Sequence, residues 1–193
     1  GAAQATFLLL LGILLTGLLL LGWSFDGGVR LFGLGLAGLA LWLGRHDIAR
    51  RTVKQAGLTR FIAICLLTGY VWLGISGLSA MWFGGVPVGP QYDATLHAFF
   101  LGFVFAMIFA HAPIIFPAVL GARMAYRPLF YAHVVLLQVT LVVRFIGDAA
   151  GWSAGRQVGG LLNAVMLLLF LVNTVSALQS PPERAGTAQG RGA

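Results

Sequence analysis

The chain has 193 residues, of which 59% are hydrophobic and only 9% are charged, and its formal net charge is +7 at pH 7. Soluble domains carry about 25% charged residues, so this composition excludes an ordinary soluble enzyme and a disordered chain. The single cysteine, Cys65, excludes an intrachain disulfide framework.

Six apolar segments are long enough, or nearly so, to cross a bilayer, which takes about 20 residues in a helix. Barrel strands would need alternating polarity, which these segments lack, so we predict helices. The fold class expected is all-α: a polytopic integral membrane protein with six transmembrane helices in a bundle, within a domain of residues 1–178. The predicted helices are 5–23, 29–44, 61–83, 94–116, 129–147 and 158–178.

Basic residues predict the orientation of these helices. Nine of the twelve lysines and arginines fall in the segment 45–60, in the connection that holds Arg123 and Arg127, and in the tail. The positive-inside rule then places both termini in the cytoplasm. We expect a multi-pass protein of the cell's inner (plasma) membrane. Because topology accounts for the positive charge, we expect a lipid bilayer and no nucleic acid as partner. The Pro- and Gly-rich tail, 179–193, is expected to be disordered.

Ionisable residues inside membrane helices are costly and therefore mark candidate functional sites. In the fourth predicted helix His97 and His111 are fourteen residues apart, which returns an α-helix to nearly the same face about 21 Å further on. In the fifth, His133 and Arg144 share a face with Asp148, which can pair with Arg144 at i,i+4. Antiparallel helices would therefore form an inner pair, His111 with His133, and an outer group around His97.

Haem b is the first cofactor that suits this pattern, because two imidazoles from facing helices can ligate one iron and an arginine such as Arg144 can pair with a propionate. The fourteen-residue spacing resembles that of di-haem b-type cytochromes, but Gly147 stands where a fourth ligand would be needed. Copper is the alternative, with His97, His111 and His133 as ligands and Cys65 or a methionine as a soft ligand. The plain alternative is helix–helix hydrogen bonding by the histidines and a neutralised ion pair between Arg144 and Asp148.

The stretch from Leu96-His97-Ala98-Phe99-Phe100-Leu101-Gly102 to Met107, followed by Arg144 late in the next helix, resembles the later half of NnrS-family proteins. The similarity covers about residues 93–148. The NnrS family consists of polytopic bacterial membrane proteins associated with haem, copper and the response to nitric oxide. The resemblance implies a haem or metal role for His97 and Arg144, whereas His111 and His133 depend on their helical spacing.

Three functions remain open from the sequence. The first is a haem- or metal-binding protein linked to electron transfer or to a small gas such as nitric oxide. The second is a non-catalytic accessory or assembly subunit, packed against other subunits of a larger respiratory or photosynthetic membrane complex. The third is a transporter or proton path. The HExxH and P-loop motifs of soluble catalytic sites do not occur, and the sequence assigns no catalytic residue.

Overall fold

The computed structural model describes residues 1–179, so residues 180–193 of the predicted tail lie outside the described part. Six helices in that part are long and apolar enough to span a membrane, which confirms the predicted fold class. The chain is thus a multi-pass α-helical membrane protein. The helices are α1 (Ala2–Leu20), α2 (Phe25–His46), α3 (Ala49–Thr52), α4 (Gly57–Phe83), α5 (Pro90–His97), α6 (Phe105–Leu120), α7 (Phe130–Ala149) and α8 (Ser153–Ala177).

The fourth span is a composite, because a π-helix, η1 (Ala98–Val104), joins α5 to α6 without a break. The second span is longer than predicted. It starts at Phe25, where Ser24 acts as N-cap and its side-chain oxygen accepts a hydrogen bond from the Gly27 amide at 3.3 Å. Apolar periodicity alone underestimates the length of such a helix, because its first turn also holds the charged residue Asp26.

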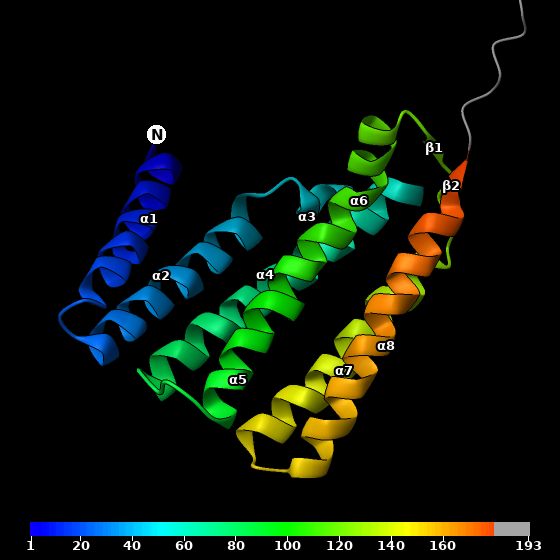
Figure 1. Ribbon diagram of the computed structural model, residues 1–193. Coiled ribbons are helices and arrows are strands. Elements are labelled where there is room, and N and C mark those ends of the chain that lie inside the picture. Colours follow the sequence, from blue (N-terminus) through cyan, green and yellow to red (C-terminus); the bar gives the residue numbers. More distant parts are fainter. Residues whose placement is uncertain (180–193) are drawn as a thin grey trace, which may run out of the picture.

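The helices pack largely in chain order. α2 lies between α1 and α4, α4 packs against the composite span, and α7 pairs with α8. Figure 1 shows the result: α1 and α2 form one side of the molecule, α7 and α8 form the other, and α4 and the composite span lie between them. The upper end in this view carries the N-terminus and α3, together with the antiparallel pair β1 (Arg123–Met124) and β2 (Leu178–Gln179). The lower end carries the α1–α2, α4–α5 and α7–α8 connections.

Glycines allow the closest helix contacts, as expected where helix backbones meet in a membrane. A Cβ on Gly77 of α4 would lie 2.6 Å from the amide nitrogen of Ala37 in α2. A Cβ on Gly159 of α8 would lie 2.8 Å from the amide nitrogen of Arg144 in α7. Both contacts involve backbone atoms that cannot swing aside, so larger residues would separate these helix pairs.

The main core lies where α4, the composite span, α7 and α8 meet. Its fully buried members include Phe61, Phe109, Leu137 and Met166. Trp72 packs against this core and donates its indole N–H to the Gln138 side-chain oxygen at 2.7 Å. The Trp72–Gln138 hydrogen bond holds α7, which supplies part of the charged site described next, against α4.

Candidate functional site

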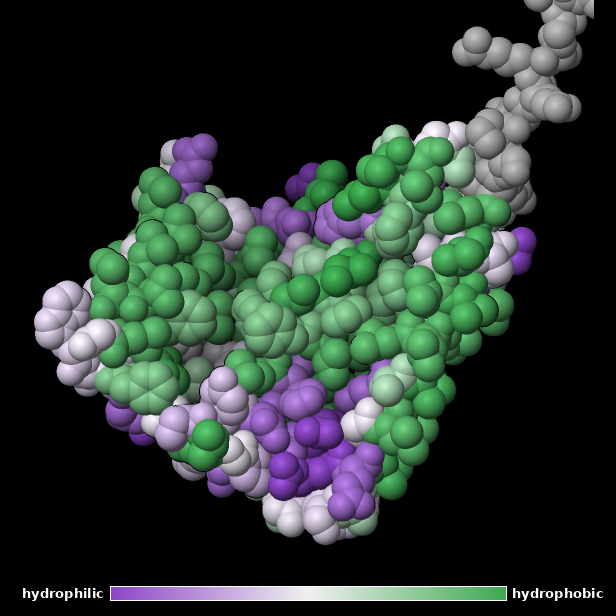
Figure 2. Space-filling model, in the orientation of Figure 1, coloured by the Kyte–Doolittle hydropathy of each residue, from purple (hydrophilic) through white to green (hydrophobic). Residues whose placement is uncertain are grey.

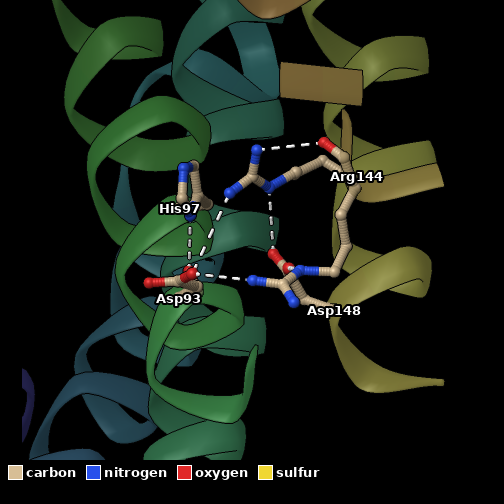
Figure 3. Close-up of polar contacts among 5 residues, drawn as sticks. Asp93, His97, Arg144 and Asp148 are labelled. Carbon is tan, nitrogen blue, oxygen red and sulfur yellow. Dashed lines mark hydrogen bonds and ion pairs between the residues drawn. The ribbon is translucent and has the colours of Figure 1, made fainter. Parts of the chain in front are cut away.

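Five charged or imidazole side chains gather at the lower end of the bundle. Asp93 and His97 come from α5, Arg144 and Asp148 from α7, and Arg156 from α8. Figure 3 shows their side chains converging, and Figure 2 shows a hydrophilic patch at the lower end, below a largely apolar middle of the surface. We call this group the ion cluster. It links α5, α7 and α8 at one end of the bundle.

Asp148 is the centre of the ion cluster. Its side chain is 0% exposed, and each of its oxygens accepts a hydrogen bond from a different arginine. Arg144 Nε donates to Oδ2 at 3.1 Å and Arg156 Nε donates to Oδ1 at 2.7 Å. The predicted i,i+4 pair of Arg144 with Asp148 is therefore confirmed, and a second cation completes the neutralisation of the buried carboxylate.

Asp93 closes the ion cluster from α5. Its Oδ2 accepts a hydrogen bond from Arg156 Nη2 at 3.3 Å and lies 4.0 Å from Arg144 Nη2. Arg144 also donates from Nη1 to the backbone carbonyl of Arg156 at 3.0 Å. Two carboxylates thus balance two guanidinium groups. The Asp93 side chain is 35% exposed, so the ion cluster is closed around Asp148 and open to the surroundings at Asp93.

His97 lies one helical turn above Asp93, beside the Arg144 guanidinium (Figure 3). Its Nδ1 is 2.6 Å from the backbone carbonyl of Asp93. A carbonyl only accepts hydrogen bonds, so Nδ1 donates its proton in this contact, and in the tautomer with that proton the lone pair lies on Nε2. Histidines that ligate metals are commonly oriented by this kind of bond. The structure therefore brings His97, Arg144 and Asp148 together, as the sequence predicts.

The π-helix begins at the residue after His97. Its hydrogen bonds run from i+5 to i, as between the Phe105 amide and the Phe100 carbonyl, so its turns hold more residues than those of an α-helix. The fourteen residues from His97 to His111 consequently do not return to one face. His111 lies on the exposed face of α6, with Nδ1 2.6 Å from the Met107 carbonyl.

His133 is 2% exposed and lies among phenylalanine rings, with ring centroids 4.7 Å away for Phe109 and 5.3 Å away for Phe170. Its Nδ1 accepts a weak hydrogen bond from the Asn173 amide at 3.4 Å, and Nε2 has no partner among the described residues. The face of α6 that reaches this ring carries Phe109 together with Ala112 and Pro113, and the gap there is too narrow for a water molecule.

The structure therefore does not bring His111 and His133 to a common site. The cause is local: regular α-helical spacing was the basis of the predicted stripe, and η1 changes the rotation of everything after it. The soft ligand candidate Cys65 is buried in the main core and has no disulfide partner. Within residues 1–179 no group of three or more histidine, cysteine, aspartate or glutamate side chains is placed to hold a metal ion by itself.

Two members of the ion cluster, Asp93 and Arg156, were not among the residues predicted for the site. Arg156 could have been found from symmetry about the α7–α8 turn. Asp148 and Arg156 each lie four residues from Trp152, and the turn is tight, since the Trp152 amide donates to the Gly147 carbonyl at 2.8 Å. Residues equidistant from such a turn face each other across a helical hairpin. No comparable local signal places Asp93.

An apolar cleft of about 380 Å³ lies between α2, α4 and the α5–η1 segment. It is lined mainly by aromatic and aliphatic side chains, among them Phe32, Phe83 and Phe99, with Tyr92 and Thr95 as polar members. None of the histidines lines it. The cleft is therefore distinct from the ion cluster, which faces α7 and α8.

The fold and the ion cluster define a class: multi-pass helical membrane proteins with a neutralised charge cluster at one end of the bundle. The chain belongs to a family described as a domain of unknown function (DUF8744), whose model matches residues 1–179. That match covers all six membrane-spanning helices. No curated protein and no solved structure matches the chain.

Proposed function

We propose that this protein binds haem b, or a metal ion such as copper, through His97, and acts in electron transfer or in the response to a small gas such as nitric oxide. The observation that supports this most directly is the state of His97. Its ring is held by the Asp93 carbonyl and keeps Nε2 free of any hydrogen bond from the described residues. His97 also shares the ion cluster with two arginines, Arg144 and Arg156.

The residues around His97 fit haem ligation by one imidazole better than by two. Haem held by a single proximal histidine leaves one iron position open to a gas molecule, whereas two histidines would occupy both. Arg144 would pair with a propionate, because its Nη2 makes only a 4.0 Å contact with Asp93. His111 and His133 stay in the proposal as separate candidate ligands. His111 keeps Nε2 without a partner in the described part of the chain, whereas His133, whose Nδ1 accepts from Asn173, would have to release its Nε2 proton to bind a metal ion.

The test is the absorption spectrum of the purified protein, with a pyridine haemochrome assay and metal analysis. His97→Ala should abolish bound cofactor. His46→Ala is the matched control, because His46 makes the same ring contact with a carbonyl one turn earlier, 2.9 Å from Trp42 O, yet lies exposed at the opposite end of the bundle. A colourless, metal-free wild-type protein that is fully folded would contradict the proposal, as would equal cofactor content in both variants.

The second candidate is an accessory or assembly subunit of a larger membrane complex. The observation that favours it is the exposure of α1, in which only Gly17 is buried although the helix spans Ala2–Leu20. Such a helix has surface available for another subunit as well as for lipid. This function predicts co-purification with partner subunits from the native membrane and no effect of His97→Ala on that association. An isolated, cofactor-loaded monomer would contradict it.

We further propose the inner (plasma) membrane as location, with both termini in the cytoplasm. The described chain begins and ends at the upper end of the bundle (Figure 1), so residues 1 and 179 lie on the same side whichever way the protein is inserted. The basic residues of the α2–α4 connection lie at that same end and support a cytoplasmic assignment. Reporter fusions at residues 1 and 179 should both report the cytoplasm; a periplasmic signal from either would refute this orientation.

A further inference from the structure

We infer that the groove between α2 and α4 at the upper end of the bundle binds an anionic phospholipid, with its phosphate held by Arg45 and Arg50. Two adjoining concave surfaces carry this inference. One is an apolar groove along the membrane-facing sides of α2 and α4, and the other is a cationic cup around α3. They share Arg45 and Arg50, so the apolar and the charged surfaces are continuous.

The apolar groove has a volume of about 700 Å³. It is lined by α2 from Ala37 to Arg45 and by α4 from Leu67 to Leu78. Small residues, Gly44 and Gly74, form part of its lining, while Leu41, Val71 and Leu78 line it with side chains that are 78%, 61% and 59% exposed. Because these side chains lie in a membrane-spanning region, the groove faces acyl chains. Its shape suits a chain lying lengthwise between two helices.

The cationic cup has a volume of about 570 Å³ and is lined by Arg45, Arg50, Arg51 and Lys54, all exposed, with Asp47 as the single carboxylate. That carboxylate is already engaged. Its Oδ2 accepts a hydrogen bond from the Tyr70 hydroxyl at 3.0 Å, and its Oδ1 accepts one from the Ala49 amide at 2.7 Å. Four cations therefore face one carboxylate whose oxygens are both occupied, and the cup has a strong excess of positive charge.

This combination matches the chemistry of an anionic phospholipid. Arginine forks bind phosphate through paired hydrogen bonds, and basic pockets at the ends of membrane helices bind anionic headgroups. Phosphatidylcholine also carries a phosphate, but the excess cations would repel its quaternary ammonium. Free phosphate could enter the cup without using the groove. The proposal concerns the opposite end of the molecule from His97 and does not depend on the proposed cofactor.

The experiment measures how much phosphatidylglycerol the detergent-purified protein retains, by native mass spectrometry, against phosphatidylcholine with the same acyl chains. Arg45→Gln should reduce retention of phosphatidylglycerol about tenfold, since one charge-assisted interaction is lost. The substitution keeps the fold, because the Arg45 contact within this region is made by its backbone carbonyl, which accepts from Arg50 Nη1 at 3.1 Å. Val71→Trp should reduce retention by filling the groove.

Arg127→Gln is the matched control, because Arg127 is an exposed arginine beside β1 at the same end but lines neither surface. It should leave retention unchanged. An equal loss in Arg45→Gln and Arg127→Gln would show general attraction to positive charge and overturn the inference. So would equal retention of both lipids, or displacement of phosphatidylglycerol by an equal concentration of inorganic phosphate. If Val71→Trp has no effect, the groove is not the acyl site and the inference fails.

Discussion

Replacing Asp148 with asparagine tests whether the ion cluster holds α5, α7 and α8 together. The carboxylate is 0% exposed and contacts Arg156 at 2.7 Å and Arg144 at 3.1 Å. Removing one partner of a buried ion pair costs about 3–5 kcal/mol. The arginine side chains are 17% and 32% exposed and can regain some solvent, so we expect the lower limit, about 3 kcal/mol. For a chain of this length that corresponds to a fall of about 6–12 °C in Tm.

The assay is thermal unfolding in detergent, with two other aspartates as controls. Asp93→Asn should cost about 1 kcal/mol or less, because Asp93 is 35% exposed and its contacts are 3.3 and 4.0 Å long. Asp26→Asn should leave Tm almost unchanged, since Asp26 and Arg30 form the same i,i+4 pair with 61% and 46% exposure. A Tm for Asp148→Asn equal to or above that for Asp93→Asn would refute the assignment of Asp148 as the buried centre.

Two further predictions concern α7. Gly159→Val should force α8 away from Arg144 and lower both Tm and the yield of folded protein. Gly12→Val should change neither quantity, because a Cβ at Gly12 would meet nothing within 4 Å. Equal effects of the two substitutions would exclude close α7–α8 packing as the cause. His133→Leu should leave the free energy of unfolding unchanged within about 1 kcal/mol or raise it, because an unpartnered buried N–H costs about 1–3 kcal/mol. A large fall in Tm together with loss of a bound cofactor would instead identify His133 as a ligand.

Much of the fold could be predicted from the sequence because each span is an apolar run bounded by polar residues. The outer group was also predictable in part, since Arg144 and Asp148 are separated by four residues within one helix, where α-helical geometry determines their contact. Arg156 joins them through a hairpin, which requires knowing that the α7–α8 turn is tight. Asp93 joins through its hydrogen bond with Arg156, which lies 63 residues away in the sequence, and local pattern carries no information about such a pairing.

The inner histidine pair shows why spacing arguments fail across an irregular helix. Apolar composition is the same for α- and π-helical residues, so nothing in the segment Ala98–Val104 distinguishes them by hydropathy. Tertiary packing constrains Gly102, which is buried against the Trp72 ring and has no room for a Cβ. The change of rotation introduced there leaves His111 exposed on α6, while His133 remains buried among phenylalanines.

The chain-order packing of the helices has a consequence for biogenesis. α2 meets its predecessor α1 as its main early neighbour, α4 then packs on α2, and α7 and α8 emerge as a hairpin that pairs with itself. Each newly inserted segment thus finds a partner that the ribosome has already delivered, and few contacts wait for distant parts of the sequence. Asp93 is one exception, because its carboxylate stays without Arg144 and Arg156 until the α7–α8 hairpin has entered the bilayer. That charge is therefore neutralised only after the α7–α8 hairpin has been inserted.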